Sequence, residues 1–148
     1  METIFLLSKT YIDGDDVLNK IEEIAQRMGN EFINDNEISI NQYIDDDNIS
    51  RITFGGLFLD YFNETLQGKN FIDGYGCEMS INYHSNGDML LPFLKEFLKE
   101  YPDMLLYKET GGKSSPSNPF VYNKEHFDNY SGTDYYALLD NPPQENLT

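Results

Sequence analysis

The chain has 148 residues, of which 39% are hydrophobic, which suits one domain with a buried core. Ten Lys and Arg residues stand against 26 Asp and Glu residues, and the formal net charge of -16 argues against a nucleic-acid-binding surface. No apolar run reaches the roughly 18 residues of a membrane span, and a single cysteine excludes an internal disulfide framework. The first eight residues lack the basic region of a signal peptide, so we expect an acidic cytoplasmic protein.

A strand and a helix are the first elements that the sequence predicts. Residues 3–12 form a β-rich apolar run, and an acidic turn follows at residues 13–16. Asp15 is the predicted N-cap of the helix, because short acidic side chains there accept hydrogen bonds from free backbone N–H groups. Gly29 is the predicted helix end. The apolar residues that recur at helical spacing between them are Val17, Ile21, Ile24, Ala25 and Met28.

Three strands are predicted in the middle of the chain. Residues 32–43 and 51–61 form the first two, separated by a solvated turn at residues 45–48. Gly55 and Gly56 interrupt the second of them and predict a bulge or a close approach of two backbones. Residues 77–84 alternate between apolar and polar side chains, which is typical of a half-buried strand.

A second helix precedes the last predicted strand. Its apolar stripe consists of Leu90, Leu94, Phe97, Leu98 and Tyr101. Because proline is tolerated near the first turn of a helix, Pro92 predicts that the regular helix begins within a residue or two of Leu91. Residues 104–107 form the last strand, and residues 110–119 have loop composition. Short helical elements are predicted at 123–130 and 134–139.

This order of elements predicts an α+β fold for a single domain, residues 1–148. The expected architecture is one mixed or antiparallel sheet of about five strands with two helices on one face, akin to a split βαβ arrangement. The body of the domain is expected at about residues 1–110. A loop and C-terminal arm, residues 111–148, would pack against it.

Motifs that would indicate catalysis are absent from the sequence. There is no phosphate-binding loop and no dinucleotide-binding motif. Cys77 lies on the apolar side of its strand, and neither His84 nor His126 has an evident nucleophile to activate. The acidic turns at 13–16 and 45–48 fail the calcium-loop pattern at its sixth and twelfth positions. We therefore predict no catalytic residue, no metal and no cofactor.

Negative charge is concentrated in the first third of the chain, where residues 1–50 hold twelve acidic and three basic residues, a net of -9. Such a field raises the encounter rate with a basic partner, although an acidic surface also serves solubility. The chain is also rich in tyrosine, which is common at protein interfaces and at core edges. The residues that we expect to contact a partner are Asp13, Asp15, Asp16, Tyr43, Asp45, Asp46 and Asp47.

A small, acidic, tyrosine-rich α+β chain of this kind resembles the immunity proteins of bacterial polymorphic and contact-dependent toxin systems. The acidic turns at 13–16 and 45–47 carry the resemblance, together with the segment at 93–103, Phe-Leu-Lys-Glu-Phe-Leu-Lys-Glu-Tyr-Pro-Asp. The resemblance implies a non-enzymatic protein that binds and neutralises a basic toxin domain, such as a nuclease.

Two other hypotheses remain open at this point. The first is another acidic adaptor protein or a nucleic-acid mimic, although a mimic would spread its charge along an elongated surface. The second is a small enzyme or ligand-binding domain, with a site near His84, the glycine pair and the loop at 111–119.

Overall fold

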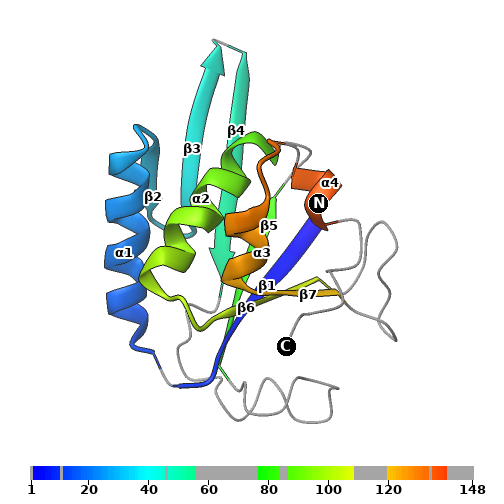
Figure 1. The fold of residues 1–148 in the computed structure, drawn as a ribbon. Helices are drawn as coiled ribbons and strands as arrows, with labels where there is room; N and C mark the ends of the chain where they lie inside the picture. Colours follow the sequence, from blue (N-terminus) through cyan, green and yellow to red (C-terminus); the bar gives the residue numbers. More distant parts are fainter. Residues whose placement is uncertain are drawn as a thin grey trace.

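The computed structural model describes residues 2–10, 12–45, 47–55, 77–83, 87–108, 120–133 and 135–139. Within these ranges the chain forms one seven-stranded antiparallel sheet and four helices (Figure 1). The elements are β1 (Glu2–Ser8), α1 (Gly14–Arg27), β2 (Glu31–Asn34), β3 (Ile38–Asp45), β4 (Asn48–Gly55), β5 (Cys77–Tyr83), α2 (Gly87–Glu100), β6 (Leu105–Lys108), β7 (Phe120–Tyr122), α3 (Lys124–Asn129) and α4 (Tyr135–Leu139). The predicted α+β class is confirmed, with two strands more than expected.

Strand order in the sheet is β2-β3-β4-β5-β1-β6-β7, so the first strand of the chain lies inside the sheet. The prediction of a single strand over residues 32–43 is wrong, because β2 and β3 are two strands of a hairpin. The turn between them is polar, and the Asp35 N–H donates to the Glu37 carbonyl at 3.2 Å. The other additional strand, β7, pairs with β6 and brings Phe120 opposite Lys108.

The N-terminal ends of both long helices differ from their predicted positions. Asp13, and not Asp15, is the N-cap of α1, and its carboxylate accepts the Asp15 N–H at 2.8 Å. Gly29 follows the helix with a φ of 77°, a backbone conformation that favours glycine. Helix α2 begins at Gly87, so Pro92 lies in its second turn. Burial of the helical residues that precede Pro92 offsets the hydrogen bond that its missing N–H cannot make.

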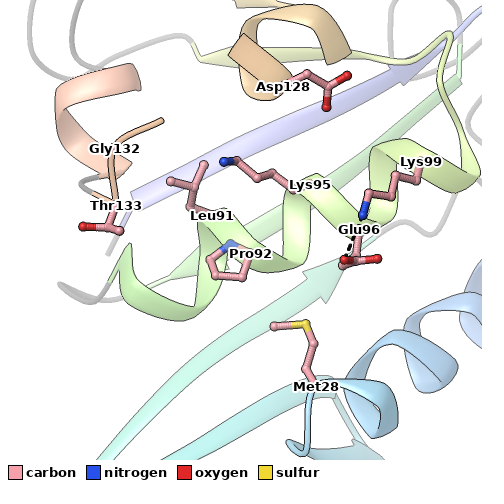
Figure 2. Close-up of a pocket in the computed structure, with 9 residues that line it drawn as sticks. All are labelled: Met28, Leu91, Pro92, Lys95, Glu96, Lys99, Asp128, Gly132 and Thr133. Atoms are coloured by element: carbon pink, nitrogen blue, oxygen red, sulfur yellow. Dashed lines mark hydrogen bonds and ion pairs between the residues drawn. The ribbon is translucent and has the colours of Figure 1, made fainter. Parts of the chain in front are cut away.

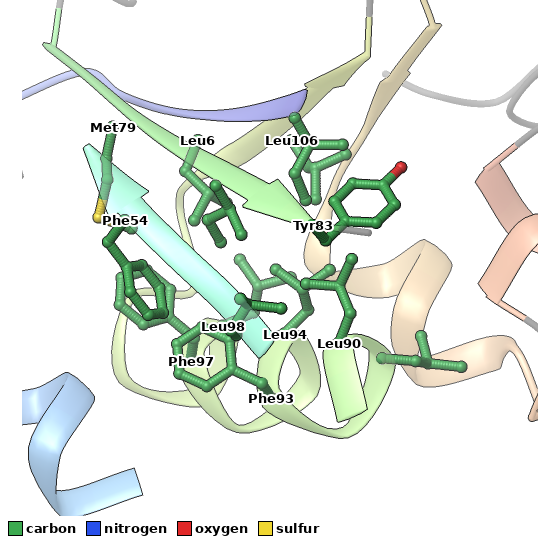
Figure 3. Close-up of a cluster of buried hydrophobic side chains, with 14 of the residues drawn as sticks. Leu6, Phe54, Met79, Tyr83, Leu90, Phe93, Leu94, Phe97, Leu98 and Leu106 are labelled. Atoms are coloured by element: carbon green, nitrogen blue, oxygen red, sulfur yellow. The ribbon is translucent and has the colours of Figure 1, made fainter. Parts of the chain in front are cut away.

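The hydrophobic core lies between the helices and one face of the sheet. Figure 1 shows α1, α2 and α3 on the same face. Figure 3 shows Leu6 and Leu106 of the sheet above the buried side of α2, and the rings of Phe54 and Phe93 are 5.2 Å apart. Phe127 of α3 and Leu139 of α4 are fully buried members of the same cluster. The C-terminal segment therefore completes the core and does not merely lie against it.

Candidate partner-binding surface

The β3–β4 hairpin projects beyond the helix layer at one end of the molecule (Figure 1). Pairing between β2 and β3 ends at Glu31 and Asn41, and β3 continues for four more residues beside β4. At the tip, the Asp47 N–H donates to the Asp45 carboxylate at 2.9 Å. This local bond stabilises the turn in the way that aspartate side chains commonly do. The hairpin thus presents the second acidic turn at a protruding end.

Two large apolar side chains on this hairpin are exposed. Tyr43 is 58% exposed and Ile49 is 49% exposed, and the two residues are direct cross-strand partners. Both lie close to the tip that carries Asp45 and Asp47, whose side chains are also exposed. An aromatic and an aliphatic side chain beside carboxylates is a composition that protein interfaces use. Sequence reasoning missed Ile49, because the predicted turn ended at residue 48 and the predicted strand began at Arg51, so Ile49 was assigned to neither.

A polar network across three strands holds the Tyr43 side chain. The Tyr43 hydroxyl donates to Glu31 Oε1 at 2.6 Å, and the Asn41 amide donates to the same oxygen at 3.2 Å. Arg51 Nε then donates to Asn41 Oδ1 at 2.7 Å. Asn41 itself is 1% exposed, so the centre of the network is shielded from water. This network could not be predicted from sequence, because Glu31 and Asn41 come together only when β2 folds back on β3.

Electrostatics in this network favour a charged Glu31. The hydrogen bonds from Tyr43 and then Asn41 lower the pKa of the Glu31 carboxyl below its usual 4.5. The same bond to Glu31 is the main cause that raises the pKa of Tyr43 above 10.0. Tyr43 therefore stays a neutral donor and Glu31 a charged acceptor at neutral pH, and their hydrogen bond orients the tyrosine ring.

The first acidic turn lies elsewhere. Asp13, Asp15 and Asp16 are exposed at the N-terminal end of α1, and Figure 1 shows that end of the helix at the opposite end of the molecule from the hairpin tip. Asp13 has a structural task there as the N-cap. The fold therefore separates the two acidic turns that sequence reasoning treated alike. Asp46, between the two tip aspartates, lies outside the described residues.

Charge is unevenly distributed between the helices and the hairpin region. Residues 31–55 carry six acidic residues and a single basic one, Arg51, which is a net of -5. On the helices, acidic side chains pair with cations across α1 and α2: Arg27 with Glu96 at 3.2 Å and Lys20 with Glu100 at 3.6 Å. Residues 13–27, α1 with its cap, carry five acidic and two basic residues, a net of -3, so both regions are negative and the larger net charge lies on residues 31–55.

Residues considered for chemistry have structural roles where the structure describes them. His126 Nδ1 accepts the Asn123 N–H at 3.0 Å in a capping box at the start of α3, and desolvation lowers the pKa of His126 below 6.5. A Cβ on Gly55 would meet Ser80 Oγ, a side-chain atom of its cross-strand partner, at 2.8 Å, so this position leaves little room for a side chain. The alternative hypothesis of a small enzyme or ligand-binding domain placed its site near Gly55 and three further features. These features lie outside the described residues: His84, Gly56 and the loop at 111–119.

Comparison with known proteins gives no match: no family model, no curated protein and no solved structure matches the chain significantly. Within the described ranges, no three His, Cys, Asp or Glu side chains gather closely enough to hold a metal ion. None of the helices in the described part of the chain has the length and apolar character needed to cross a membrane.

Proposed function

We propose that this chain is a non-enzymatic binding protein that neutralises a basic partner, in the manner of an immunity protein that blocks a toxin domain. The β3–β4 hairpin is the contact surface. One observation carries the proposal: an exposed Tyr43–Ile49 pair lies beside an acidic tip on a protruding hairpin. Apolar anchors supply binding energy when they are buried by a partner, and the charges around them raise the association rate.

Tyr43 has the properties of an interface anchor. Tyrosine is enriched among the interface residues whose truncation to alanine costs about 2 kcal/mol or more of binding free energy. The hydrogen bond to Glu31 already restricts the ring in the unbound protein. Immobilising a flexible side chain on association costs roughly 0.5–1.5 kcal/mol of binding free energy. For Tyr43 this cost should be smaller, because the ring is already restricted.

The local concentration of charge favours a protein partner over a role as a nucleic-acid mimic. A mimic needs negative charges spaced along an extended surface, as phosphates are along a duplex. Here the net charge of -5 over residues 31–55 contrasts with helices whose carboxylates are partly neutralised by lysine and arginine. A compact acidic hairpin with apolar anchors suits a basic patch on a folded protein.

The experiment is a comparison of variants in partner capture from the native host, at low and at high salt. The test variant carries Tyr43→Ala, Asp45→Asn and Asp47→Asn. Asparagine keeps the side-chain oxygen that stabilises the turn, so the hairpin should still form. The control variant carries Asp15→Asn and Asp16→Asn, which removes the same number of charges at the other end of the molecule and leaves the Asp13 cap intact.

The expected result is a basic protein captured at low salt by the wild type and the control but not by the test variant. Co-production with that partner should then abolish its toxic or enzymatic activity. Capture of the same partner by the test variant, or inhibition that survives its three substitutions, would contradict the assignment of the hairpin.

A further inference from the structure

A surface pocket of ≈ 580 Å³ lies on the helix layer (Figure 2), and the residues that line it in the described part of the chain come from outside the β3–β4 hairpin. Helix α2 forms its floor with Leu91 and Pro92, and Met28 at the end of α1 borders it on one side. Gly132 and Thr133, between α3 and α4, border it on the other. The volume is within the range of about 300–1,000 Å³ that is typical of small-molecule sites.

Two contacts fix the wall that the chain after α3 provides. The Lys95 ammonium, on α2, donates to the Tyr130 carbonyl oxygen at 3.0 Å. The Tyr130 ring lies so close to Gly132 that a Cβ there would be 2.6 Å from the ring hydroxyl. A side chain at position 132 would therefore have to displace the ring. The segment is held against α2 by its backbone and leaves the pocket beside it.

Lys95 differs from the other Lys and Arg residues of α1, α2 and α3 in its partner. Each of the others pairs with a carboxylate: Lys20 with Glu23 and Glu100, Arg27 and Lys99 with Glu96, and Lys124 with Asp128. In the part of the chain that the structure describes, Lys95 contacts a neutral carbonyl oxygen and no carboxylate. Its charge is thus uncompensated, although the residue is half-buried beside apolar Leu91.

The charged side chains that line the pocket balance one another, in a chain whose net charge is -16: Lys95 and Lys99 stand against Glu96 and Asp128. Glu96 pairs with Lys99 and also with Arg27, which does not line the pocket. Asp128 also borders the pocket, but Lys124 pairs with it. Both carboxylates therefore have cationic partners of their own, and Lys95 keeps N–H donors that no carboxylate of the described residues accepts. A ligand that suits this site would combine an anionic group, which Lys95 can bind, with an apolar part that packs against Leu91 and Pro92.

We propose that this pocket binds a small organic anion with an apolar body. Its carboxylate accepts hydrogen bonds from Lys95, and its apolar part packs against Leu91, Pro92 and Met28. Lysine has three N–H donors, and the Tyr130 carbonyl occupies one of them. The remaining donors are available to the ligand. This inference is independent of the proposed role of the hairpin, which uses a different surface.

The test compares octanoate with octanamide as probes, because the two share an apolar body and differ in charge. We expect saturable octanoate binding by calorimetry, and about tenfold weaker binding of octanamide, the difference expected of one charge-assisted hydrogen bond. Octanoate should shift the backbone amide signals of Leu91, Gly132 and Thr133 in NMR spectra. Lys95→Met should remove the preference for the carboxylate, and Lys95→Arg should restore it.

Lys20→Met is the matched control, because Lys20 also lies on the helix layer but does not line the pocket. It removes the same charge and should keep the preference for octanoate. The comparison of the two probes on the wild type needs no substitution, so a folding defect in Lys95→Met leaves the test intact. Equal affinity for both probes, no saturable binding, or signal shifts confined to other parts of the molecule would overturn the proposal.

Discussion

Single side chains order the two regions on which the functional proposals depend. Tyr43 donates to Glu31 on the hairpin, and His126 accepts from Asn123 at the start of α3, which leads to the wall of the pocket. The first bond is stronger when Glu31 is charged, because a carboxylate accepts hydrogen bonds more strongly than a carboxylic acid does. The second requires that His126 Nδ1 carry no proton. Titration therefore tests both local structures directly.

Lowering the pH should destabilise the protein through His126. Desolvation lowers the pKa of His126 below 6.5, so the unfolded chain binds the proton more readily than the folded one. The contribution to stability is present above pH 6.5 and is lost as the pH falls through the lower pKa of the folded state. His126→Gln is the matched variant, because glutamine at this position can form the same capping box without titrating.

The measurement is urea unfolding of both proteins at several pH values from above pH 6.5 downward, with the pKa of His126 followed by NMR. The wild type should lose stability relative to His126→Gln as the pH falls. If the free energies of unfolding of the two proteins changed in parallel with pH, or if the pKa of His126 were above 6.5, the role of the neutral imidazole in the cap would be contradicted.

Removal of the Tyr43 hydroxyl should raise the pKa of Glu31. The hydrogen bond from Tyr43 is the largest cause that lowers this pKa, so Tyr43→Phe should move it upward toward 4.5. NMR titration of the Glu31 carboxyl in both proteins measures the change. Ile49→Ala, which alters the neighbouring position without touching the bond, is the control. An unchanged pKa in Tyr43→Phe would mean that the tyrosine is not held by Glu31 in solution.

At the scale of elements, periodicity predicted the helices well and their ends poorly. The apolar spacing of α1 and α2 is sufficient, because a helix in a small domain is stabilised mainly by the face that it buries. The predicted start of α2 was wrong, because it relied on the local preference of proline for the first turn of a helix. Met89 and Leu90, which precede Pro92, are helical because their side chains are buried in the core. The turn between β2 and β3 was missed although residues 34–37, Asn-Asp-Asn-Glu, form a polar run that interrupts the alternation of apolar and polar side chains.

Truncation of the core faces of the two long helices should be strongly destabilising. Ile21 and Phe97 are fully buried, and the Phe97 ring is 5.7 Å from Phe93 and 4.9 Å from Tyr101 between ring centroids. Ile21→Ala and Phe97→Ala should each lower the free energy of unfolding by about 2–5 kcal/mol. Urea unfolding measures the loss, and Lys99→Ala on the exposed side of α2 should change it by about 0.5 kcal/mol or less. Losses that small at both core positions would refute the assigned helix faces.

At the scale of the whole molecule, the fold decides which of the acidic residues act together. The sequence predicted an acidic excess near the N-terminus and named Tyr43 with Asp45, Asp46 and Asp47. It could not separate the two acidic turns, because that depends on the direction of α1 relative to the β3–β4 hairpin. The contribution of Ile49 and Glu31 could not be predicted from the sequence either, because the pairing of the strands brings these residues beside Tyr43.

The association rate with the captured partner tests the central proposal most directly. Stopped-flow measurements between roughly 0.01 and 0.15 M salt cover the range in which screening of surface charges changes most. For the wild type, association should slow as salt rises, and dissociation should change little, because exposed charges act mainly on the encounter. Asp45→Asn with Asp47→Asn should lower the association rate several-fold and flatten its salt dependence, whereas Asp15→Asn with Asp16→Asn should do so much less. A rate indifferent to salt, or equal losses from the two variants, would contradict an interface at the hairpin.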